Sequence, residues 1–79
     1  MFKSYQDFLE FIQTHLRKSI DAEKRDSTIF KRWEEGKIDM NECKKAFCKN
    51  NGITRNHEDL PDGVFEIWLN SEGYIRGEK

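Results

Sequence analysis

The clearest pattern in the chain is a run of apolar residues at helical spacing near its N-terminus. They fall on one face of a helical wheel: Tyr5, Phe8, Leu9, Ile12, Leu16 and Ile20. Ser4, with Asp7 three residues later, resembles a capping box at a helix start. The pattern predicts a helix from about residue 5, with an apolar face that reaches Ile20. Phe11 lies outside this face, on its flank.

Two further helices are predicted before residue 53. Ile29, Phe30 and Trp33 form an apolar face that ends at Gly36, a residue suited to the position after a helix C-terminus. This places a second helix near residues 22–35. Asp39 is a good N-cap for a third helix, which Gly52 ends. Its inner face carries Met40, Cys43, Ala46 and Phe47.

The last sixteen residues, 64–79, predict a β-hairpin. Phe65, Ile67 and Leu69 alternate with other residues, as on a strand. The segment Asn70-Ser71-Glu72-Gly73 is typical of a turn, and a short apolar run follows it. Both faces of this hairpin would be apolar, with Tyr74 on the Phe65 face and Trp68 on the opposite face.

Taken together, these elements predict one α+β domain over residues 1–79. About three N-terminal helices fill a helical part, residues 1–53, and a two-stranded antiparallel hairpin packs on them. Residues 54–63 connect the two parts as a loop or a short helix that starts at Thr54. We expect a core that contains Phe8, Ile12, Leu16, Trp33 and Phe47.

Composition supports a folded chain without strong electrostatic preference. Charged residues make up 37% and apolar residues 35%, but two Trp, two Tyr and six Phe are enough to form a core. The net charge of −1 creates no general attraction to nucleic acid or anionic membranes. Cys43 and Cys48 are five positions apart, so a helix would point them away from each other. Unpaired thiols are typical of a reducing compartment. With no membrane-spanning run and no signal peptide, a cytoplasmic protein is expected.

No motif for catalysis or for a cofactor is recognisable. Zinc sites are built from closely spaced Cys and His ligands. A helix would point the side chains of Cys43 and Cys48 away from each other, and no motif in the sequence places His15 or His57 beside them. A nucleophile would need a base held beside it, and nothing places either histidine there. We therefore expect no enzyme activity, no bound metal, no cofactor and no small-molecule substrate.

A DNA-binding regulator is one possible function. A helix, a turn at Gly52 and the segment 54–60 have the outline of a helix-turn-helix, with the hairpin as a wing. The residues expected to contact DNA in this interpretation are Arg55, Asn56, His57 and Arg76. Because Glu58 and Asp59 lie in the same segment, its charge opposes phosphate binding.

Binding to another protein is the function we expect. A small domain seldom hides ten aromatic residues, and exposed aromatic side chains favour interfaces. The partner-binding residues expected are Trp68, Ile75, Val64 and Phe11. The protein would act as a small regulator, inhibitor or accessory subunit, of the kind that phages and mobile elements encode, and a homodimer through the hairpin edges is a further possibility.

Overall fold

The protein is all-helical across the residues that the structure describes, 4–15, 19–54 and 56–76, and they contain no β-strand. In this computed structural model the helices are α1 (Tyr5–His15), α2 (Ile20–Glu34), α3 (Met40–Asn50) and α4 (Asp62–Ser71), with one short 3-10 helix, η1 (His57–Asp59). The predicted α+β class is therefore wrong. None of these helices is long and apolar enough to cross a membrane.

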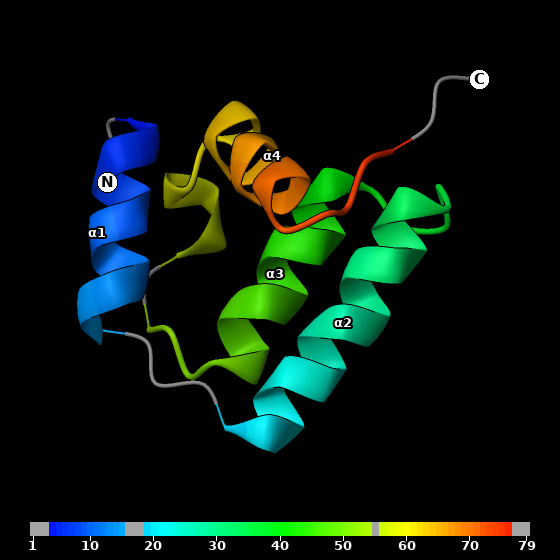
Figure 1. The fold of residues 1–79 in the computed structure, drawn as a ribbon, viewed down its shortest axis with the longest axis horizontal. Coiled ribbons are helices and arrows are strands. Elements are labelled where there is room, and N and C mark those ends of the chain that lie inside the picture. Colours follow the sequence, from blue (N-terminus) through cyan, green and yellow to red (C-terminus); the bar gives the residue numbers. More distant parts are fainter. Residues whose placement is uncertain (1–3, 16–18, 55, 77–79) are drawn as a thin grey trace.

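The helices α2 and α3 lie side by side, and α4 lies across one end of this pair, between it and α1 (Figure 1). The first helix packs mainly against α4, whereas η1 packs against α3. The segment after α4 runs towards α2, so the two ends of the described chain lie on opposite sides of the molecule (Figure 1).

The segment predicted as the first strand of a hairpin forms α4 instead. A strand would place Trp68 opposite Phe65 and Leu69. A helix brings these three residues, spaced i, i+3 and i+4, to one face, and all three are buried. Ile67, which alternation assigned to the same face as Phe65, is 51% exposed. The helical arrangement prevails because it buries the largest side chain together with its apolar neighbours.

The residues interpreted as a hairpin turn are the C-terminus of α4. Gly73 has a φ of +99°, which favours glycine, and its N–H donates to the carbonyl of Asn70 at 3.1 Å. The N–H of Tyr74 donates to the carbonyl of Leu69 at 2.9 Å. This is the pattern of a helix that ends at a glycine. A glycine with positive φ serves a turn and a helix end equally well, so it did not distinguish the two.

The first helix is shorter than its apolar pattern predicted. It ends at His15, and a new helix begins at Ile20 after the N-cap Ser19, whose hydroxyl accepts the N–H of Ala22 at 3.1 Å. Ile20 consequently leaves the predicted apolar face and is 76% exposed. Leu16, predicted in the core, lies outside the described residues.

The predicted second and third helices are confirmed, and their ends follow local signals. Gly36 and Gly52 both have positive φ, +79° and +65°, at the C-terminal ends of α2 and α3. At the start of α3, the Asp39 carboxylate accepts the N–H of Glu42 at 2.8 Å. The segment 54–63, predicted as a loop or short helix, contains the single turn η1 rather than a helix from Thr54.

The core is a cluster of aromatic rings to which each of the four α-helices contributes. The Trp68 ring centroid lies 5.6 Å from that of Phe8, 5.7 Å from Phe30 and 5.3 Å from Phe47. Phe65 lies at 5.8 Å from the same centre. Rings at these separations contribute attraction beyond the area they bury. Of the predicted core, burial is confirmed for Phe8, Trp33 and Phe47, whereas Ile12 is half-buried.

Two charged side chains are buried beside the aromatic cluster and bind its helices together. Lys44 of α3 donates to the carbonyl of Leu60 at 2.7 Å and forms an ion pair with Asp62 at 2.6 Å. Asp26 of α2 accepts hydrogen bonds from the side-chain amides of Asn50 and Asn51, at 3.2 and 2.9 Å. Since buried charges are costly without partners, these contacts specify how α2, α3 and the start of α4 meet.

Phe47→Ala should destabilise the protein by about 3–5 kcal/mol, because it removes a fully buried ring and leaves a cavity among four other rings. Urea denaturation measures the loss. Ile67→Ala, at the exposed face of α4, is the matched control and should cost less than about 1 kcal/mol. If Ile67→Ala costs as much as Phe47→Ala, the face of α4 assigned to the core is wrong.

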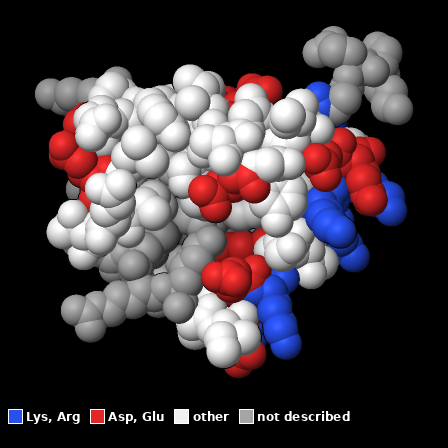
Figure 2. Space-filling view, viewed as in Figure 1, with Lys and Arg blue, Asp and Glu red and all other residues white. Residues whose placement is uncertain are grey.

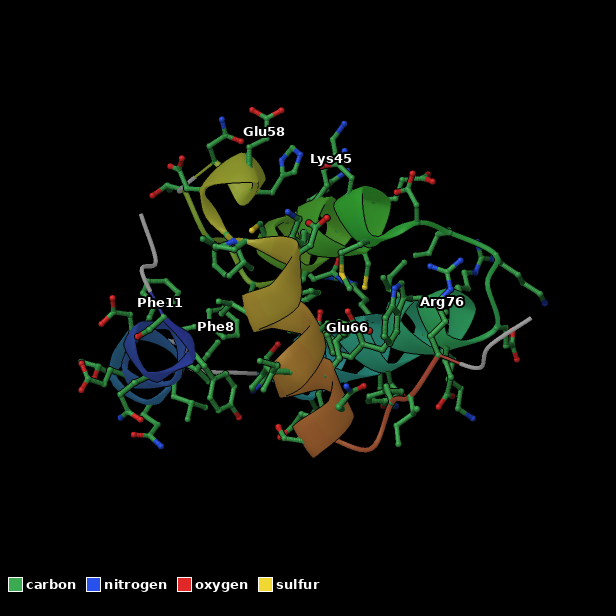
Figure 3. The ribbon with its side chains drawn as sticks, turned by 90° about the horizontal axis from the view of Figure 1, so that it is seen from above. Phe8, Phe11, Lys45, Glu58, Glu66 and Arg76 are labelled. Atoms are coloured by element: carbon green, nitrogen blue, oxygen red, sulfur yellow. The ribbon has the colours of Figure 1, made fainter. Side chains whose placement is uncertain are left out.

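Lys44→Met should lower the free energy of unfolding by about 1–3 kcal/mol, because the buried carbonyl of Leu60 loses its donor. The control is Lys45→Met, which removes the same charge from an exposed neighbour on α3 (Figure 3). Thermal and urea denaturation compare the two variants. Equal stability of both would contradict a structural role for the Lys44 ammonium.

Candidate functional site

The four residues predicted to bind a partner do not form one surface. Trp68, expected to bind a partner, is only 4% exposed and belongs to the core. Val64 and Phe11 are half-buried and pack against the core. Ile75 is 64% exposed, but it follows α4 on the α2 side, whereas Phe11 lies on α1 at the other side of the molecule (Figure 3). The predicted homodimer through hairpin edges has no basis in the described residues, because they contain no β-strand and the first predicted strand belongs to α4.

The residues predicted to contact DNA are also separated. Asn56 caps η1, where its side-chain oxygen accepts the N–H of Glu58 at 3.0 Å, and His57 belongs to the same single turn. Arg76 lies beside Gly36 at the α2–α3 turn, across the molecule from Glu58 (Figure 3). Arg55 is outside the described residues. The predicted wing is part of α4 and of the segment after it, so no winged helix-turn-helix is formed.

The two cysteines are both buried and free. Burial raises the pKa of Cys43 to about 12, and the nearby carboxylate of Asp26 adds to the increase. Burial also raises the pKa of Cys48, although Lys44 opposes this. Across the described part of the chain, no three His, Cys, Asp or Glu side chains are placed to hold a metal ion.

An acidic pocket of about 450 Å³ is the candidate site, and it lies between α2 and the end of α4. Figure 2 shows acidic side chains gathered around this hollow near the centre of the view. Most of the lining comes from one face of α2, and the rest from the two residues on either side of Gly73. The lining residues are Glu23, Lys24, Asp26, Ser27, Phe30, Glu72 and Tyr74.

The segment after α4 closes one side of this pocket. The turn at Gly73 directs Tyr74 onto α2, where its ring centroid lies 5.3 Å from that of Phe30. The Tyr74 hydroxyl shares a hydrogen bond with Ser27 at 3.3 Å. The next residue, Ile75, donates its N–H to the carboxylate of Glu34 at 3.0 Å. These contacts cover the C-terminal half of this face of α2, while its N-terminal half remains open.

The pocket is rich in negative charge. Among the described lining residues, Glu23, Asp26 and Glu72 contribute three carboxylates and Lys24 contributes one ammonium group. Asp26 is only 1% exposed, so its charge is held where water screens it weakly. The side-chain amides of Asn50 and Asn51 donate hydrogen bonds to this carboxylate. The described lining residues therefore carry more negative than positive charge.

Two exposed isoleucines are close in sequence to residues that line the pocket. Ile20 is on the same face of α2 as Glu23 and Ser27, three and seven residues later. Ile75 follows the lining residue Tyr74. With exposures of 76% and 64%, they are the most exposed large hydrophobic residues in the described part of the chain. We call this surface, formed by Ile20, Glu23, Ser27, Tyr74 and Ile75, the α2 flank.

The pocket was not predicted from the sequence. The apolar face predicted for the second helix contained Ile29, Phe30 and Trp33, whereas Ala22, Asp26 and Phe30 recur every four residues and share the buried face of α2. That spacing was the available signal for a buried Asp26. No local signal indicated Glu72 or Tyr74, because their place beside α2 depends on how α4 packs.

The raised pKa of Cys43 predicts that alkaline pH destabilises the fold. In the unfolded chain this thiol loses its proton near its ordinary value of 9.0, but in the folded protein near 12. Between these values the folded state holds a proton that the unfolded state has released, so the free energy of unfolding falls as pH rises above 9. Urea denaturation from pH 8 to 11 should show this fall, and Cys43→Ala should make it shallower. Identical slopes for both proteins would contradict the shift.

Comparison of the chain with models of protein families gave no match, and neither did comparison with curated proteins or with solved structures.

Proposed function

We propose that this protein is a small, non-catalytic protein-binding module that acts as a regulator, inhibitor or accessory subunit. Its partner binds the α2 flank. The observation that carries the proposal is that Ile20 and Ile75, the most exposed large hydrophobic residues described, are close in sequence to residues that line an open pocket: Ile20 lies one helical turn before Glu23, and Ile75 follows Tyr74. Protein interfaces commonly combine such apolar contacts with polar surroundings.

The arrangement of the two isoleucines distinguishes them from ordinary surface residues. A single exposed apolar side chain, such as Ile67 on α4, needs no explanation. Ile20 lies one helical turn before the lining residue Glu23, and Ile75 follows the lining residue Tyr74, so one partner that covers this side of α2 could contact both isoleucines and the half-buried ring of Tyr74. Clustering of this kind favours an interface over chance exposure.

The chemistry of the chain supports binding rather than catalysis. A thiolate is the nucleophilic form of cysteine, and the raised pKa values of Cys43 and Cys48 disfavour it. Both side chains are also buried, away from any substrate at the surface. Free thiols are compatible with a protein of the cytoplasm, which is the compartment we propose.

A capture experiment with matched variants tests this function. The protein is immobilised and incubated with lysate from its source cells, and bound proteins are quantified by mass spectrometry. We expect a protein that binds the unmodified chain and is reduced at least tenfold by Ile20→Asp, because the new charge opposes burial at the interface. Ile67→Asp, which changes an exposed isoleucine on α4, should retain it.

Circular dichroism establishes that both variants remain folded, and sedimentation measurements reveal whether the partner is a second copy of the chain. Loss of binding in both variants, or no binding that depends on Ile20, would contradict the proposal. The buried Trp68 is unsuitable for this test, because its replacement would disturb the aromatic core.

A further inference from the structure

The solvent-facing side of α2 carries a pair of cations that occurs twice. Lys24-Arg25 recurs seven residues later as Lys31-Arg32, and all four side chains are exposed. Seven residues make about two helical turns, so the two pairs lie on the same side of α2, about 10.5 Å apart along its axis. We call these four residues the basic face. Figure 2 shows Lys and Arg side chains gathered over α2 at the lower right of the view.

The stability of α2 accounts for only half of the basic face. Cations in the last turn of a helix are favoured by the helix dipole, which explains Lys31 and Arg32. Lys24 and Arg25 lie in the second turn, nearer the positive N-terminal end, where the dipole does not favour a cation. Because both side chains are also exposed, neither contributes to the core. The repeated pair therefore points to a ligand outside the fold.

The charges around the basic face favour a ligand with a few separate carboxylates. Asp21 and Glu35 lie at the two ends of the same side of α2, and Glu35 pairs with Lys37 at 3.3 Å. The helix as a whole carries four acidic and four basic residues. A nucleic acid has continuous negative charge along its backbone, so it would also meet these carboxylates. A protein segment with a few acidic side chains matches the cations and avoids the acids.

The basic face borders the α2 flank, because its two lysines are helical neighbours of flank residues. Lys24, which also lines the pocket, lies one turn after Ile20, and Lys31 lies one turn after Ser27. Glu23 lies on the other side of Ile20 around the helix axis. A partner that covers Ile20 therefore meets the cations of the basic face on one side of that contact.

We propose that the basic face binds an acidic helix of the protein partner. This inference rests on the proposed function, since it gives the chemistry of the partner that contacts the α2 flank. Carboxylates seven residues apart on that helix have the same axial spacing as the two cation pairs. Arg25 and Arg32 each hold a carboxylate through two parallel N–H donors, and Lys24 and Lys31 pair with carboxylates beside the apolar contact at Ile20.

The first test uses a short poly-L-glutamate peptide as the probe, at low ionic strength, and follows backbone amide resonances by NMR. We expect saturable shifts at Lys24, Thr28 and Lys31, because Thr28 lies between the two cation pairs on the same side of α2. The double variant Lys24→Gln with Lys31→Gln should weaken binding about fivefold or more, since each exposed ion pair contributes a modest attraction. Added NaCl should also weaken binding.

The matched control is Lys45→Gln with Lys49→Gln, which removes two exposed cations from α3 and changes the net charge equally (Figure 3). It should change the affinity for the probe less than about twofold. Duplex DNA and phosphatidylserine vesicles, at the same concentration of negative charge, should bind more weakly than poly-L-glutamate. Equal weakening by the control variant, or tighter binding of DNA or vesicles to the basic face, would overturn the proposal.

The second test separates this inference from the function on which it rests. In the capture experiment, Lys24→Gln with Lys31→Gln should reduce the same partner that Ile20→Asp reduces, whereas Lys45→Gln with Lys49→Gln should retain it. If the partner depends on Ile20 but not on the two lysines of α2, the acidic-helix proposal is wrong and the protein-binding function stands. If no partner depends on Ile20, the function and this inference are both wrong.

Discussion

The packing of Trp68 against phenylalanine rings from the other helices is the interaction on which the rest of the structure depends. Phe8 comes from α1, Phe30 from α2 and Phe47 from α3, and each ring lies within 6 Å of Trp68. A domain of this size buries a modest share of its surface, so a few large side chains must supply most of its hydrophobic stabilisation. The first helix packs mainly on α4, and its Phe8 side chain joins the same core as the side chains from α2 and α3.

The buried charges give this core its specific geometry. Apolar rings can slide past one another at little cost, but Lys44 and Asp26 lose solvation unless they reach particular partners. Lys44 ties α3 to Leu60 and Asp62 at the start of α4, and Asp26 ties α2 to Asn51 at the end of α3. Asp26 also adds negative charge next to Cys43, which helps to keep that thiol protonated.

The candidate site follows from the same packing. Because α4 ends beside α2, the turn at Gly73 places Tyr74 against Phe30 and leaves a pocket with Asp26 among its lining residues. The carboxylate of Asp26 thus accepts hydrogen bonds from the end of α3, and Asp26 also lines the pocket. The residues predicted from sequence as a partner surface include Ile75 of the α2 flank, but Trp68 belongs to the core that positions that flank.

Local chemistry in the sequence by itself determined where α2 and α3 end and where α3 begins. Gly36, Asp39 and Gly52 act through hydrogen bonds and backbone conformations that span a few residues, so they could be recognised without the fold. Only the tertiary structure decided the state of residues 64–71, because Phe65 and Leu69 fit a strand as well as a helix. A helix brings Trp68 to the same face, where rings from α1, α2 and α3 enclose it. Those contacts join residues up to sixty positions apart, which no local pattern contains, and the position of Tyr74 on α2 follows from them.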